Sequence, residues 1–413
     1  MENKTTKPFY NTTIPSDWEV KTLGQLGMFS KGKGILKEQV ISEGFPCIRY
    51  GEIYTTHDFI INEFKSFINE AVTLESKEIK NGDILFAGSG ETVEEIGKAV
   101  AYTGDKKAFA GGDIIILSTI SEVNVECLSF ALETDFAKRQ KRVLGQGNSV
   151  VHIYSSDLAK VKVPLPPLPE QIAIAHVLSL MDSAINQNNQ LIAQKELRKN
   201  WLMQNLLTGK KRLKGFENEK WKVKLLEDVL IPVSRPVDKP TSAFLAMGIR
   251  SHGKGTFLKP DFEPSKIEMD TLFVVRENDL IVNITFAWEQ AIAIVGKQDD
   301  GALVSHRFPT FTFNQNNGVM NYFRHFILQP KFKYLLDLIS PGGAGRNRVL
   351  SKKDFLKLEV KIPSVEEQIA IAQVLQAADK EIQLLKAKTD KLREQKKGMM
   401  QVLLTGKKRL QQK

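Results

Sequence analysis

Two stretches of the chain carry apolar residues at the seven-residue spacing that is typical of long helices packed along a common seam. Gly209 and Gly406 stand where these stretches end, as residues that stop helices do. Each helix would span about 36 residues, or roughly 54 Å, and would need a partner for its apolar stripe. The obvious partner of each helix is the other one. The predicted seam residues are Ile174, Leu178, Met181, Ile185, Ile192, Leu202 and Leu206 in the first helix and Ile371, Leu375, Ala378, Ile382, Leu385, Leu392, Met399 and Leu403 in the second.

Asn188 and Lys195 also fall on the seam of the first helix, where apolar residues are the rule. They could be imperfect packing, or they could fix the register of the two helices, as a polar residue at a core position of a coiled coil does. The sequence leaves both interpretations open.

The helical stretches belong to an internal repeat. The string EQIAIA occurs at Glu170–Ala175 and again at Glu367–Ala372, and the string LLTGKKRL occurs at Leu206–Leu213 and again at Leu403–Leu410. Both pairs are displaced by 197 positions. A weaker match pairs WEVKTL with WKVKLL near the beginning of each variable segment. The repeat predicts a unit, used twice, in which a variable segment of about 150 residues precedes a preserved segment of about 45.

The variable segments have the pattern of mixed α/β domains. Short apolar runs bounded by glycine and polar residues are typical of buried strands, and one longer stretch in each segment is typical of a helix. In each half the strands come first, followed by the helix, a loop and a final strand, so we expect the two domains to share a fold but little sequence. The predicted strands are Asp83–Gly88, Lys98–Gly104, Asp113–Thr119, Asp279–Phe286 and Ala291–Gly296, and the predicted helices are Cys127–Val143 and Asn321–Ile339, the latter as far as a break at Pro330.

The bulk composition excludes few functions, but the position of the charge is informative. The 413 residues are too many for one ordinary domain and suit two or three. The net charge is +10, and the two preserved segments carry all of it, +4 over residues 170–216 and +6 over residues 367–413. A polyanionic partner is therefore permitted, but the variable domains would have to bind it through local clusters of charge.

Two further observations favour a cytoplasmic protein. Cys47 and Cys127 are the only cysteines, which is too few for a disulfide framework and fits a reducing compartment. No apolar run approaches the roughly 18 residues of a membrane helix, and the first residues, MENKTTKPFYNTT, lack the apolar core of a signal peptide.

The chain lacks the motifs of a self-sufficient enzyme. The Pro166–Pro167 pair is followed by leucine, where the loop of an adenine methyltransferase has an aromatic residue. The stretch PDFEPSK at 260–266 places its carboxylates too close together for nuclease groups that share a metal ion. The run Gly248–Gly255 is similar to a phosphate-binding loop, but glycine stands where serine or threonine must bind magnesium. The six histidines have no zinc-binding spacing, so we expect neither a catalytic nor a metal site.

Recurring polar loops are the positive signal for function. Each variable segment has four loops, here called the recognition loops, that mix glycine with basic, amide and hydroxyl residues. Arginine can read guanine through two hydrogen bonds, asparagine and glutamine can read adenine, and glycine lets the backbone approach a phosphate. Taken singly, each loop is more often a solvated turn, but recurrence at matching places in two domains favours a surface that reads DNA. The recognition loops are 30–34, 47–54, 88–98 and 145–152 in the first segment and 248–257, 286–290, 305–308 and 342–348 in the second.

This combination resembles the specificity subunit of type I restriction-modification enzymes. The resemblance covers the whole chain, because two variable segments alternate with two near-identical helical segments ending in LLTGKKRL, and PLPPLPEQIAIAHVL, GSGETVEEIGKAVAY and NITFAWEQAIAIV are similar to pieces that recur in the family. It implies an α+β fold, with two α/β target recognition domains separated by two long helices that pack as an antiparallel coiled coil in a pseudo-twofold repeat. The implied recognition domains are residues 1–166 and 217–363, with a central helical segment at 167–216 and a distal one at 364–413.

The same resemblance implies a DNA-binding role without catalysis, in the cytoplasm of a prokaryote. Each recognition domain would read one half of a bipartite, asymmetric site in double-stranded DNA. Two methyltransferase subunits would bring S-adenosylmethionine for adenine-N6 methylation, and two restriction subunits would bring ATP and magnesium for translocation and cleavage. This chain would hold no cofactor. The residues aligned with DNA-binding loops are Lys31, Lys33, Arg49, Ser89, Glu91, His152, Arg250, His252, Lys254, Trp288, Arg307, Arg346 and Arg348.

Two other classes of function stay open at this point. The chain could be a coiled-coil scaffold whose variable domains bind protein partners, in which case it would show no salt-sensitive, sequence-selective binding of DNA. It could also be a self-sufficient enzyme, which the missing motifs disfavour and which a methylation assay on this chain alone would test.

Overall fold

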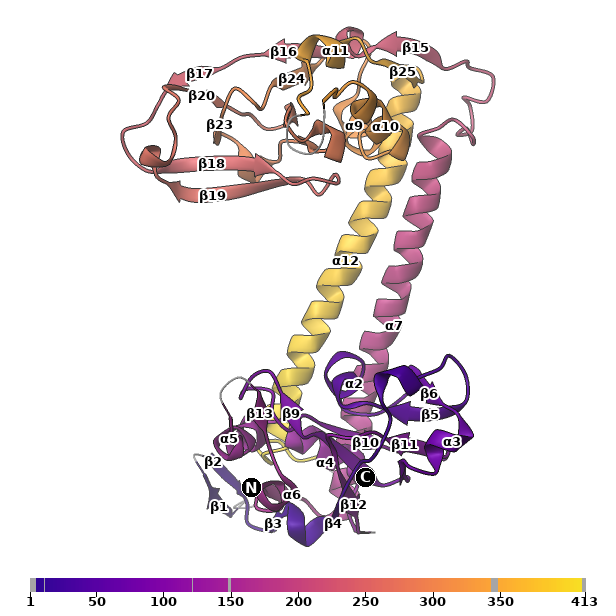
Figure 1. Ribbon diagram of the computed structural model, residues 1–413, viewed down its shortest axis with the longest axis vertical. Helices are drawn as coiled ribbons and strands as arrows, with labels where there is room; N and C mark the ends of the chain where they lie inside the picture. Colours follow the sequence, from indigo (N-terminus) through magenta and orange to yellow (C-terminus); the bar gives the residue numbers. More distant parts are fainter. Residues whose placement is uncertain (1–4, 11, 121, 148–149, 343–347, 411–413) are drawn as a thin grey trace. The chain divides into compact units, whose positions relative to one another are not determined.

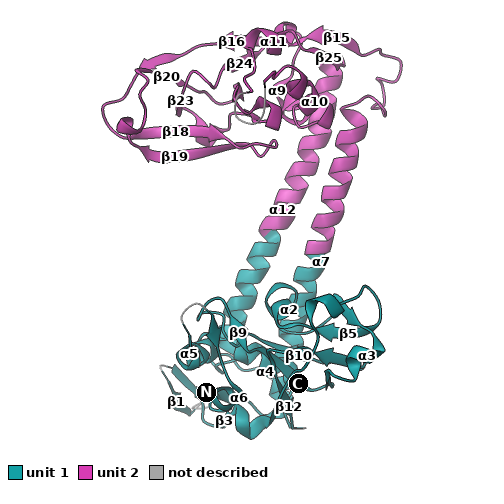
Figure 2. Ribbon diagram, in the orientation of Figure 1, with its two compact units in different colours: residues 1–188, 388–413 teal, residues 189–387 magenta. Residues whose placement is uncertain are grey.

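The computed structural model describes residues 5–10, 12–120, 122–147, 150–342 and 348–410 (Figure 1). The chain divides into two compact units, residues 1–188 with 388–413 and residues 189–387 (Figure 2). Each unit contains one variable segment together with one end of each long helix, so the division between the units crosses both helices.

The strands of the first unit form two four-stranded sheets and several two-stranded pairs. They are β1 (Thr6–Phe9), β2 (Thr12–Pro15), β3 (Glu19–Thr22), β4 (Gly27–Lys31), β5 (Phe45–Ile48), β6 (Ser66–Ile68), β7 (Lys77–Ile79), β8 (Asp83–Ala87), β9 (Ser89–Gly90), β10 (Ala99–Tyr102), β11 (Ala108–Ala110), β12 (Ile114–Thr119), β13 (Val151–His152) and β14 (Lys162–Leu165). One sheet is antiparallel with the order β10-β8-β12-β4, and the other has the order β6-β5-β11-β7 with β5 and β11 parallel. All residues of β8 and β10 are buried, which explains their continuous apolar runs.

A pair of helices packs beside these sheets where the sequence predicts one helix over Cys127–Val143. That prediction is wrong, because the segment forms two helices, α4 (Val125–Leu132) and α5 (Asp135–Leu144). Glu133 and Thr134 lie between them. Thr134 has extended backbone angles at the N-terminus of α5, and the Glu133 side chain leaves the helix to bond elsewhere in the fold. The remaining helices of this variable segment are single turns, namely α1 (Leu23–Leu26), α2 (Tyr50–Thr55), α3 (Glu70–Thr73) and α6 (Ser155–Leu158).

The second unit has a four-stranded sheet, a five-stranded sheet and one two-stranded pair. Its strands are β15 (Lys222–Leu225), β16 (Leu230–Val233), β17 (Pro236–Asp238), β18 (Phe244–Ile249), β19 (Thr256–Phe262), β20 (Thr271–Val274), β21 (Leu280–Val282), β22 (Ile292–Ile294), β23 (Leu303–Val304), β24 (Thr310–Phe313) and β25 (Glu359–Ile362). Its shorter helices are α8 (Leu226–Val229), α9 (Met320–Phe326), α10 (Pro330–Leu338) and α11 (Lys352–Leu356). Pro330 is the first residue of α10, a place where its fixed φ and missing N–H cost nothing.

The two variable segments share their topology, as the sequence predicts. The sheet order β22-β21-β24-β16 repeats β10-β8-β12-β4, and the parallel pair of β18 with β23 repeats that of β5 with β11. The strand that follows the helices also pairs in both units with the strand that contains the repeated WEVKTL or WKVKLL string, β14 with β3 and β25 with β15. Positions in the two domains can therefore be compared strand by strand and helix by helix.

Two 39-residue helices, α7 (Leu168–Leu206) and α12 (Val365–Leu403), form the preserved segments. Within the second unit, Lys195 bonds to Glu381 and Lys199 to Asp379, so residue numbers rise on one helix as they fall on the other. In the first unit Lys396 bonds to Asp182 in the same sense. The helices are thus antiparallel, and the fold is the predicted pair of α/β domains with a two-helix coiled coil.

The helix ends are part of the domain cores. In the first unit Ile174 and Leu178 of α7 lie in one apolar cluster with Leu403 of α12, and in the second unit Ile371 and Leu375 of α12 join Leu206 of α7. Burying each such side chain contributes about 1.5–3 kcal/mol. Of the predicted seam residues, Ile174, Leu178, Ile185, Leu206, Ile371, Leu375, Ile382 and Leu403 are buried, and Met181, Ile192, Leu202, Ala378, Leu385, Leu392 and Met399 are half-buried.

The seam also holds polar residues that the apolar pattern does not reveal. Thr389 is 1% exposed and Lys396 is 4% exposed, and they continue the seven-residue spacing from Ile382 to Leu403. Asn188 is buried as well, and Lys195 is half-buried with its Nζ 2.5 Å from Glu381. The coiled coil therefore buries several polar groups that must each find a partner.

Residues of the two repeated strings bond to each other and to a tryptophan, as in the first unit. Glu170 of the first EQIAIA is buried and accepts a hydrogen bond from the indole Nε1 of Trp18 at 3.2 Å. Arg409 of the second LLTGKKRL donates to both oxygens of the same carboxylate, from Nε at 2.6 Å and from Nη2 at 2.7 Å. Its guanidinium also lies 5.8 Å from the centre of the Trp18 ring.

The second unit contains the same arrangement with the other copies of the strings. Glu367 accepts from Trp221 Nε1 at 3.1 Å and from Nε and Nη2 of Arg212 at 2.7 Å and 2.6 Å. The guanidinium of Arg212 is again 5.8 Å from the Trp221 ring. The first LLTGKKRL therefore serves the second domain, and the second LLTGKKRL serves the first domain.

Candidate nucleic-acid interface

Two recognition loops of the first unit meet at a short strand pair. Ser89 of β9 pairs with His152 of β13, and the backbone N–H of Ile153 donates to the carbonyl of Gly88 at 3.0 Å. Tyr54, from the loop 47–54, donates its hydroxyl to the Ser89 carbonyl at 3.0 Å. The structure thus brings Ser89 and His152 together. Ser89 is buried, whereas the side chain of His152 is exposed.

The other loops of the first unit meet at the end of β11. Lys33 donates its backbone N–H to Ala110 at 3.1 Å, and Gly111, the next residue, donates to Ile48 at 2.9 Å, immediately before Arg49. Lys31 and Lys33 have exposed side chains. Arg49 is half-buried, with Nη2 3.7 Å from Glu52, and its Nε is a buried donor without a partner among the described residues.

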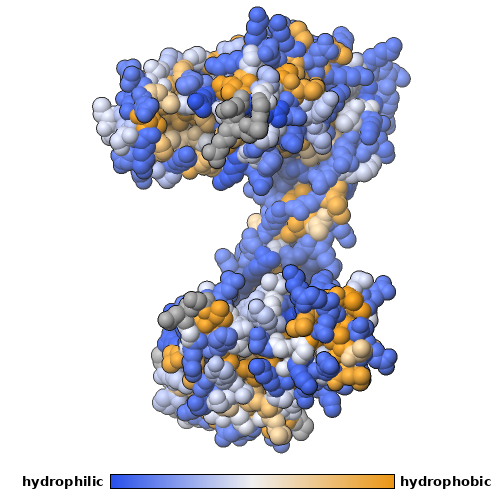
Figure 3. All heavy atoms as spheres, viewed as in Figure 1, coloured by the Kyte–Doolittle hydropathy of each residue, from blue (hydrophilic) through white to orange (hydrophobic). Residues whose placement is uncertain are grey.

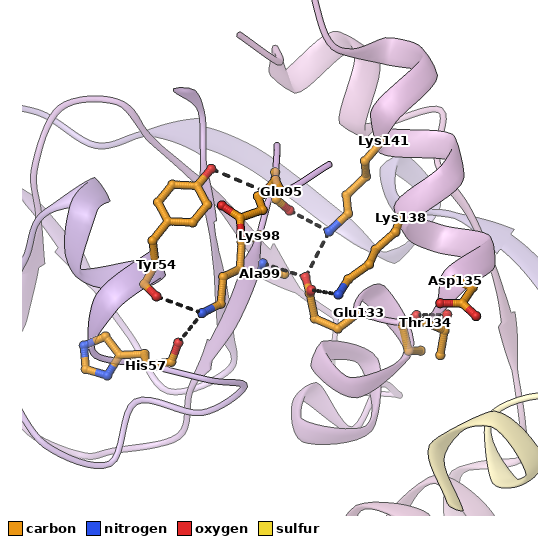
Figure 4. A network of polar contacts seen from close by, with 12 residues as sticks. Tyr54, His57, Glu95, Lys98, Ala99, Glu133, Thr134, Asp135, Lys138 and Lys141 are labelled. Atoms are coloured by element: carbon orange, nitrogen blue, oxygen red, sulfur yellow. Dashed lines mark hydrogen bonds and ion pairs between the residues drawn. The ribbon is translucent and has the colours of Figure 1, made fainter. Parts of the chain in front are cut away.

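A buried ion-pair network lies behind the loop 88–98 (Figure 4). Glu133 accepts from Lys141 Nζ at 3.0 Å, and Lys138 Nζ is 3.3 Å from its other oxygen. Lys98 at the end of the loop donates to the His57 carbonyl at 2.7 Å. Burial alone would raise the pKa of the Glu133 carboxyl, but the ammonium groups of Lys141 and Lys138 outweigh it and hold that pKa below its ordinary value. Glu133 is therefore an anion at neutral pH.

In the second unit, the loops 248–257 and 286–290 are joined by backbone bonds. His252 donates its N–H to the Glu289 carbonyl at 2.6 Å, and Gly253 donates to the Gln290 carbonyl at 3.0 Å. Ser251 Oγ donates to the Glu289 carboxylate at 2.5 Å. His252 has a φ of 62°, a left-handed conformation that is uncommon for a residue with a Cβ. The bonds to Glu289 and Gln290 hold this turn in place.

Arg348 and Trp288 join a third loop to this group. The guanidinium of Arg348 lies 5.1 Å from the centre of the Trp288 ring, and it donates to Asp337 Oδ1 at 2.6 Å and to the Ser340 carbonyl at 3.0 Å. The family resemblance implies that Arg348 binds DNA, but most of the hydrogen-bond donors of its guanidinium are used within the protein. Arg346 lies outside the described residues.

The loop 305–308 is bonded to the segment that follows β21. Ile284 donates its backbone N–H to the Arg307 carbonyl at 3.0 Å, while its own carbonyl accepts from Leu350 at 2.8 Å. The side chain of Arg307 is exposed, as is that of Lys254. Among the described residues, no carboxylate lies within ion-pair distance of either. Arg250 is also exposed, but it donates to the Thr256 carbonyl at 2.9 Å and lies 5.4 Å from the Phe257 ring.

Comparison with known proteins then decides the family. A model of the type I restriction modification DNA specificity domain matches residues 15–196 and again residues 218–394. The chain belongs to this family. It is a type I restriction-modification specificity subunit, and specificity subunits of this family are not the catalytic components of their complexes.

Similar specificity subunits span this chain from end to end. The MjaVIII type I specificity subunit of Methanocaldococcus jannaschii is 24% identical over 97% of this chain and 95% of its own length. MjaX of the same organism, provisionally named a type I specificity subunit, is 26% identical over 95% and 94%. The crystal structure of the S subunit from M. genitalium has a TM-score of 0.58 at 15% identity, covering 97% of this chain and 98% of that one. HsdS from Thermoanaerobacter tengcongensis has a TM-score of 0.51 at 16% identity, covering 96% and 99%.

The predicted DNA-binding residues of this specificity subunit fall into two groups. One group has exposed side chains in the recognition loops, where a charged or polar head can reach a ligand, and the other has buried or half-buried side chains. The exposed group is Lys31, Lys33, Glu91, His152, Arg250, His252, Lys254 and Arg307, and the buried or half-buried group is Arg49, Ser89, Trp288 and Arg348. Because they are less constrained, the exposed residues are the better candidates for contacts to DNA.

Sequence reasoning missed an aromatic cleft in the second unit of this specificity subunit. The cleft has a volume of about 470 Å³ and is lined mainly by apolar groups from β18, β19 and β23, with Ser251, Asn283 and Ser305 also on its wall. Lys259 lies over two of its rings, 5.5 Å from Phe257 and 5.6 Å from Phe262. The two phenylalanines of β19, Phe257 and Phe262, were the available signal.

Neither a metal-binding cluster nor a membrane-spanning helix occurs within the described part of the chain. No group of three or more His, Cys, Asp or Glu residues there could hold a metal ion. Among the described helices, none is long and apolar enough to span a membrane.

Proposed function

We propose that this specificity subunit reads a bipartite, asymmetric site in double-stranded DNA, with one half-site read by each variable domain. The observation that carries the proposal is the convergence of recognition loops at equivalent places in two domains of the same topology. In the first domain, the loop 88–98 that follows β8 is bonded to the loop that follows β5. In the second domain, the loop 286–290 that follows β21 is bonded to the loop that follows β18. The two domains differ in sequence in these loops, so they would read different bases.

Exposed cations would supply the first, sequence-independent attraction to DNA. Lys31 and Lys33 in the first domain and Lys254 and Arg307 in the second are exposed. Neutralising phosphates with such groups releases counterions, so binding should weaken steeply as the salt concentration rises. Base selectivity would come from the groups that reach base edges, among which Arg307 is the best placed.

The chemistry would be brought by partner subunits. We propose that two methyltransferase subunits bind this chain and supply S-adenosylmethionine for adenine-N6 methylation, and that two restriction subunits supply ATP-dependent translocation and cleavage with magnesium. Support comes from apolar side chains exposed on the long helices, with Leu197 70%, Trp201 47% and Leu384 61% exposed. Figure 3 shows an apolar patch on these helices, between hydrophilic surfaces. Exposed apolar patches of this kind mark sites of protein association.

Mapping the methylated adenines tests this function directly. The complex of this chain with its methyltransferase subunit would be incubated with a DNA library of random sequence, and modified adenines would be located by sequencing. We expect one methylated adenine in each half of a site whose two halves are separated by a fixed gap. We propose that the same modification takes place in the cytoplasm. Methylation without a bipartite motif, or unselective binding that ignores sequence, would instead favour a scaffold that binds protein.

A further inference from the structure

In the first unit, the end of the recognition loop 88–98 is tied to the turn between α4 and α5 (Figure 4). Lys141 is 1% exposed, and its Nζ donates to the Gly97 carbonyl at 2.7 Å and to Glu133 Oε1 at 3.0 Å. The same Glu133 oxygen accepts the backbone N–H of Ala99 at 3.1 Å. Both sides of the segment 97–99 are therefore held by side chains, one from the turn between α4 and α5 and one from α5 itself.

In the second unit, Gln290 makes the equivalent tie in the opposite direction. Here the side chain belongs to the recognition loop and the backbone group belongs to the helical turn. Gln290 is 7% exposed, and its Nε2 donates to the carbonyl of Ile327 at 2.8 Å. Its own backbone carbonyl accepts the N–H of Gly253 in the loop 248–257 at 3.0 Å. One residue thus connects two recognition loops with the turn between α9 and α10.

The two ties occupy matching positions. Gly97 and Gln290 each stand two residues before the next sheet strand, β10 or β22, with left-handed φ values of 67° and 62°. Glu133 and Ile327 are the C-terminal cap residues of the matching helices α4 and α9. The left-handed conformation favours glycine, so glutamine there carries a conformational cost. A buried side-chain bond that glycine could not make offsets that cost.

We propose that the Glu133–Lys141 pair and Gln290 are positioning residues that set base selectivity, each for the half-site read by its own domain. The inference rests on the proposed DNA-reading function. None of the three side chains is exposed, so they would act by fixing the backbone of the loops that carry recognition groups. The first domain uses a buried ion pair for this purpose, and the second uses a neutral amide.

Base readout depends on donors held in place before DNA arrives. A loop that can shift by a bond length loses its preference for one base edge over another, while its attraction to phosphate changes little. Loosening a tie should therefore lower discrimination between correct and substituted half-sites more than it lowers total DNA binding. A tie with only a structural role would lower stability without changing base preference.

Gln290→Asn is the mildest test. Asparagine tolerates the left-handed conformation, and its shorter side chain cannot reach the Ile327 carbonyl. For the first domain, the double variant Glu133→Gln with Lys141→Met removes both charges together, so no unpaired buried charge is left. Gln298→Asn, at an exposed position of the same domain, is the matched control for Gln290→Asn.

The experiment measures methylation of a library of half-site variants by the complex with the methyltransferase subunit. We expect Gln290→Asn to lower the preference for one correct half-site over its single-base variants about tenfold, and the double variant to do so for the other half-site. The control should keep both preferences. Unchanged preferences in folded Gln290→Asn, or equal loss in both half-sites, would overturn the proposal. If the wild-type complex shows no bipartite motif, it is instead the proposed function that fails.

Discussion

Arg409 and Glu170 lie 239 residues apart in the sequence and are joined by two hydrogen bonds, at 2.6 Å and 2.7 Å. The pair brings the last preserved string of the chain to the beginning of the first long helix and to Trp18 of the first domain. The first variable segment is therefore completed by the end of the chain. Arg212 and Glu367 make the same pair for the second segment.

Arg409→Ala should destabilise the first unit alone. It would leave the Glu170 carboxylate, whose side chain is 7% exposed, with the Trp18 indole as its one remaining side-chain partner among the described residues. Removing one member of a buried pair costs roughly 3–5 kcal/mol, and partial exposure of Arg409 places this case at the lower end. Hydrogen exchange should speed up in the first unit and stay unchanged in the second.

Arg212→Ala provides the mirror-image control for this experiment, because it should affect only the second unit. Lys408→Ala, at an exposed neighbour of Arg409, should have no measurable effect on either. Equal destabilisation of both units by Arg409→Ala would contradict the assignment of each arginine to one domain.

His325 should make the second unit less stable in mild acid. Its ring is 2% exposed, and burial lowers its pKa from the ordinary value of 6.5 to about 4, although Asp379 acts in the opposite direction. Lys199 and Arg324 also face it and disfavour its charged form. Between pH 6.5 and 4 the unfolded chain binds a proton that the folded chain does not, so stability falls as the pH falls, by up to about 3 kcal/mol.

The substitution His325→Phe should remove this pH dependence. Phe130 is the sixth residue of α4, as His325 is of α9, so the fold accepts phenylalanine at this place. His325 Nε2 has no hydrogen-bond partner among the described residues and lies 3.6 Å from Asp379 Oδ2, so the variant removes this contact but no hydrogen bond. Urea unfolding at pH 7 and pH 5 gives the measurement. A pH dependence that survived in the variant would assign it to another group.

Arg307→Ala should weaken specific binding by about 1–3 kcal/mol and leave nonspecific binding nearly unchanged, if Arg307 reads a base edge. Its side chain is exposed, in contrast to Arg348, which is bonded to Asp337 and Ser340. Arg348→Ala should therefore act mainly on the stability of the second unit. Titrations with specific and random duplexes separate the cases. A uniform loss across all sequences would make Arg307 a phosphate contact.

Two matched ion pairs of the coiled coil should differ in energetic weight. Lys396 is 4% exposed, bonded to Asp182 and 3.6 Å from the centre of the Phe59 ring, whereas the Lys199–Asp379 pair is partly exposed. Asp182→Asn would leave the buried ammonium without the carboxylate that it is bonded to, and we expect a loss of about 3 kcal/mol. Asp379→Asn should cost less than about 1 kcal/mol. Thermal unfolding of both variants makes the comparison, and equal losses would refute it.

The elements that local patterns specify could be predicted from the sequence. The seven-residue spacing from Ile174 to Leu206 was sufficient for a long helix, because such a stripe must be buried against a partner. The displaced strings showed that the architecture is used twice, and the short apolar runs identified the central strands of both domains. These features depend on neighbours in the chain, which the sequence displays directly.

The pairing of residues that are distant in the chain became visible in the folded structure. Nothing in two identical copies of LLTGKKRL says that Arg409 belongs to the first domain and Arg212 to the second. Nor does an apolar pattern reveal that Lys396 occupies the seam, or that Glu133 leaves its helix to meet Lys141. A buried charge or a strained turn is stable only when its partner is present, and that partner comes from a remote part of the chain that folding alone brings near.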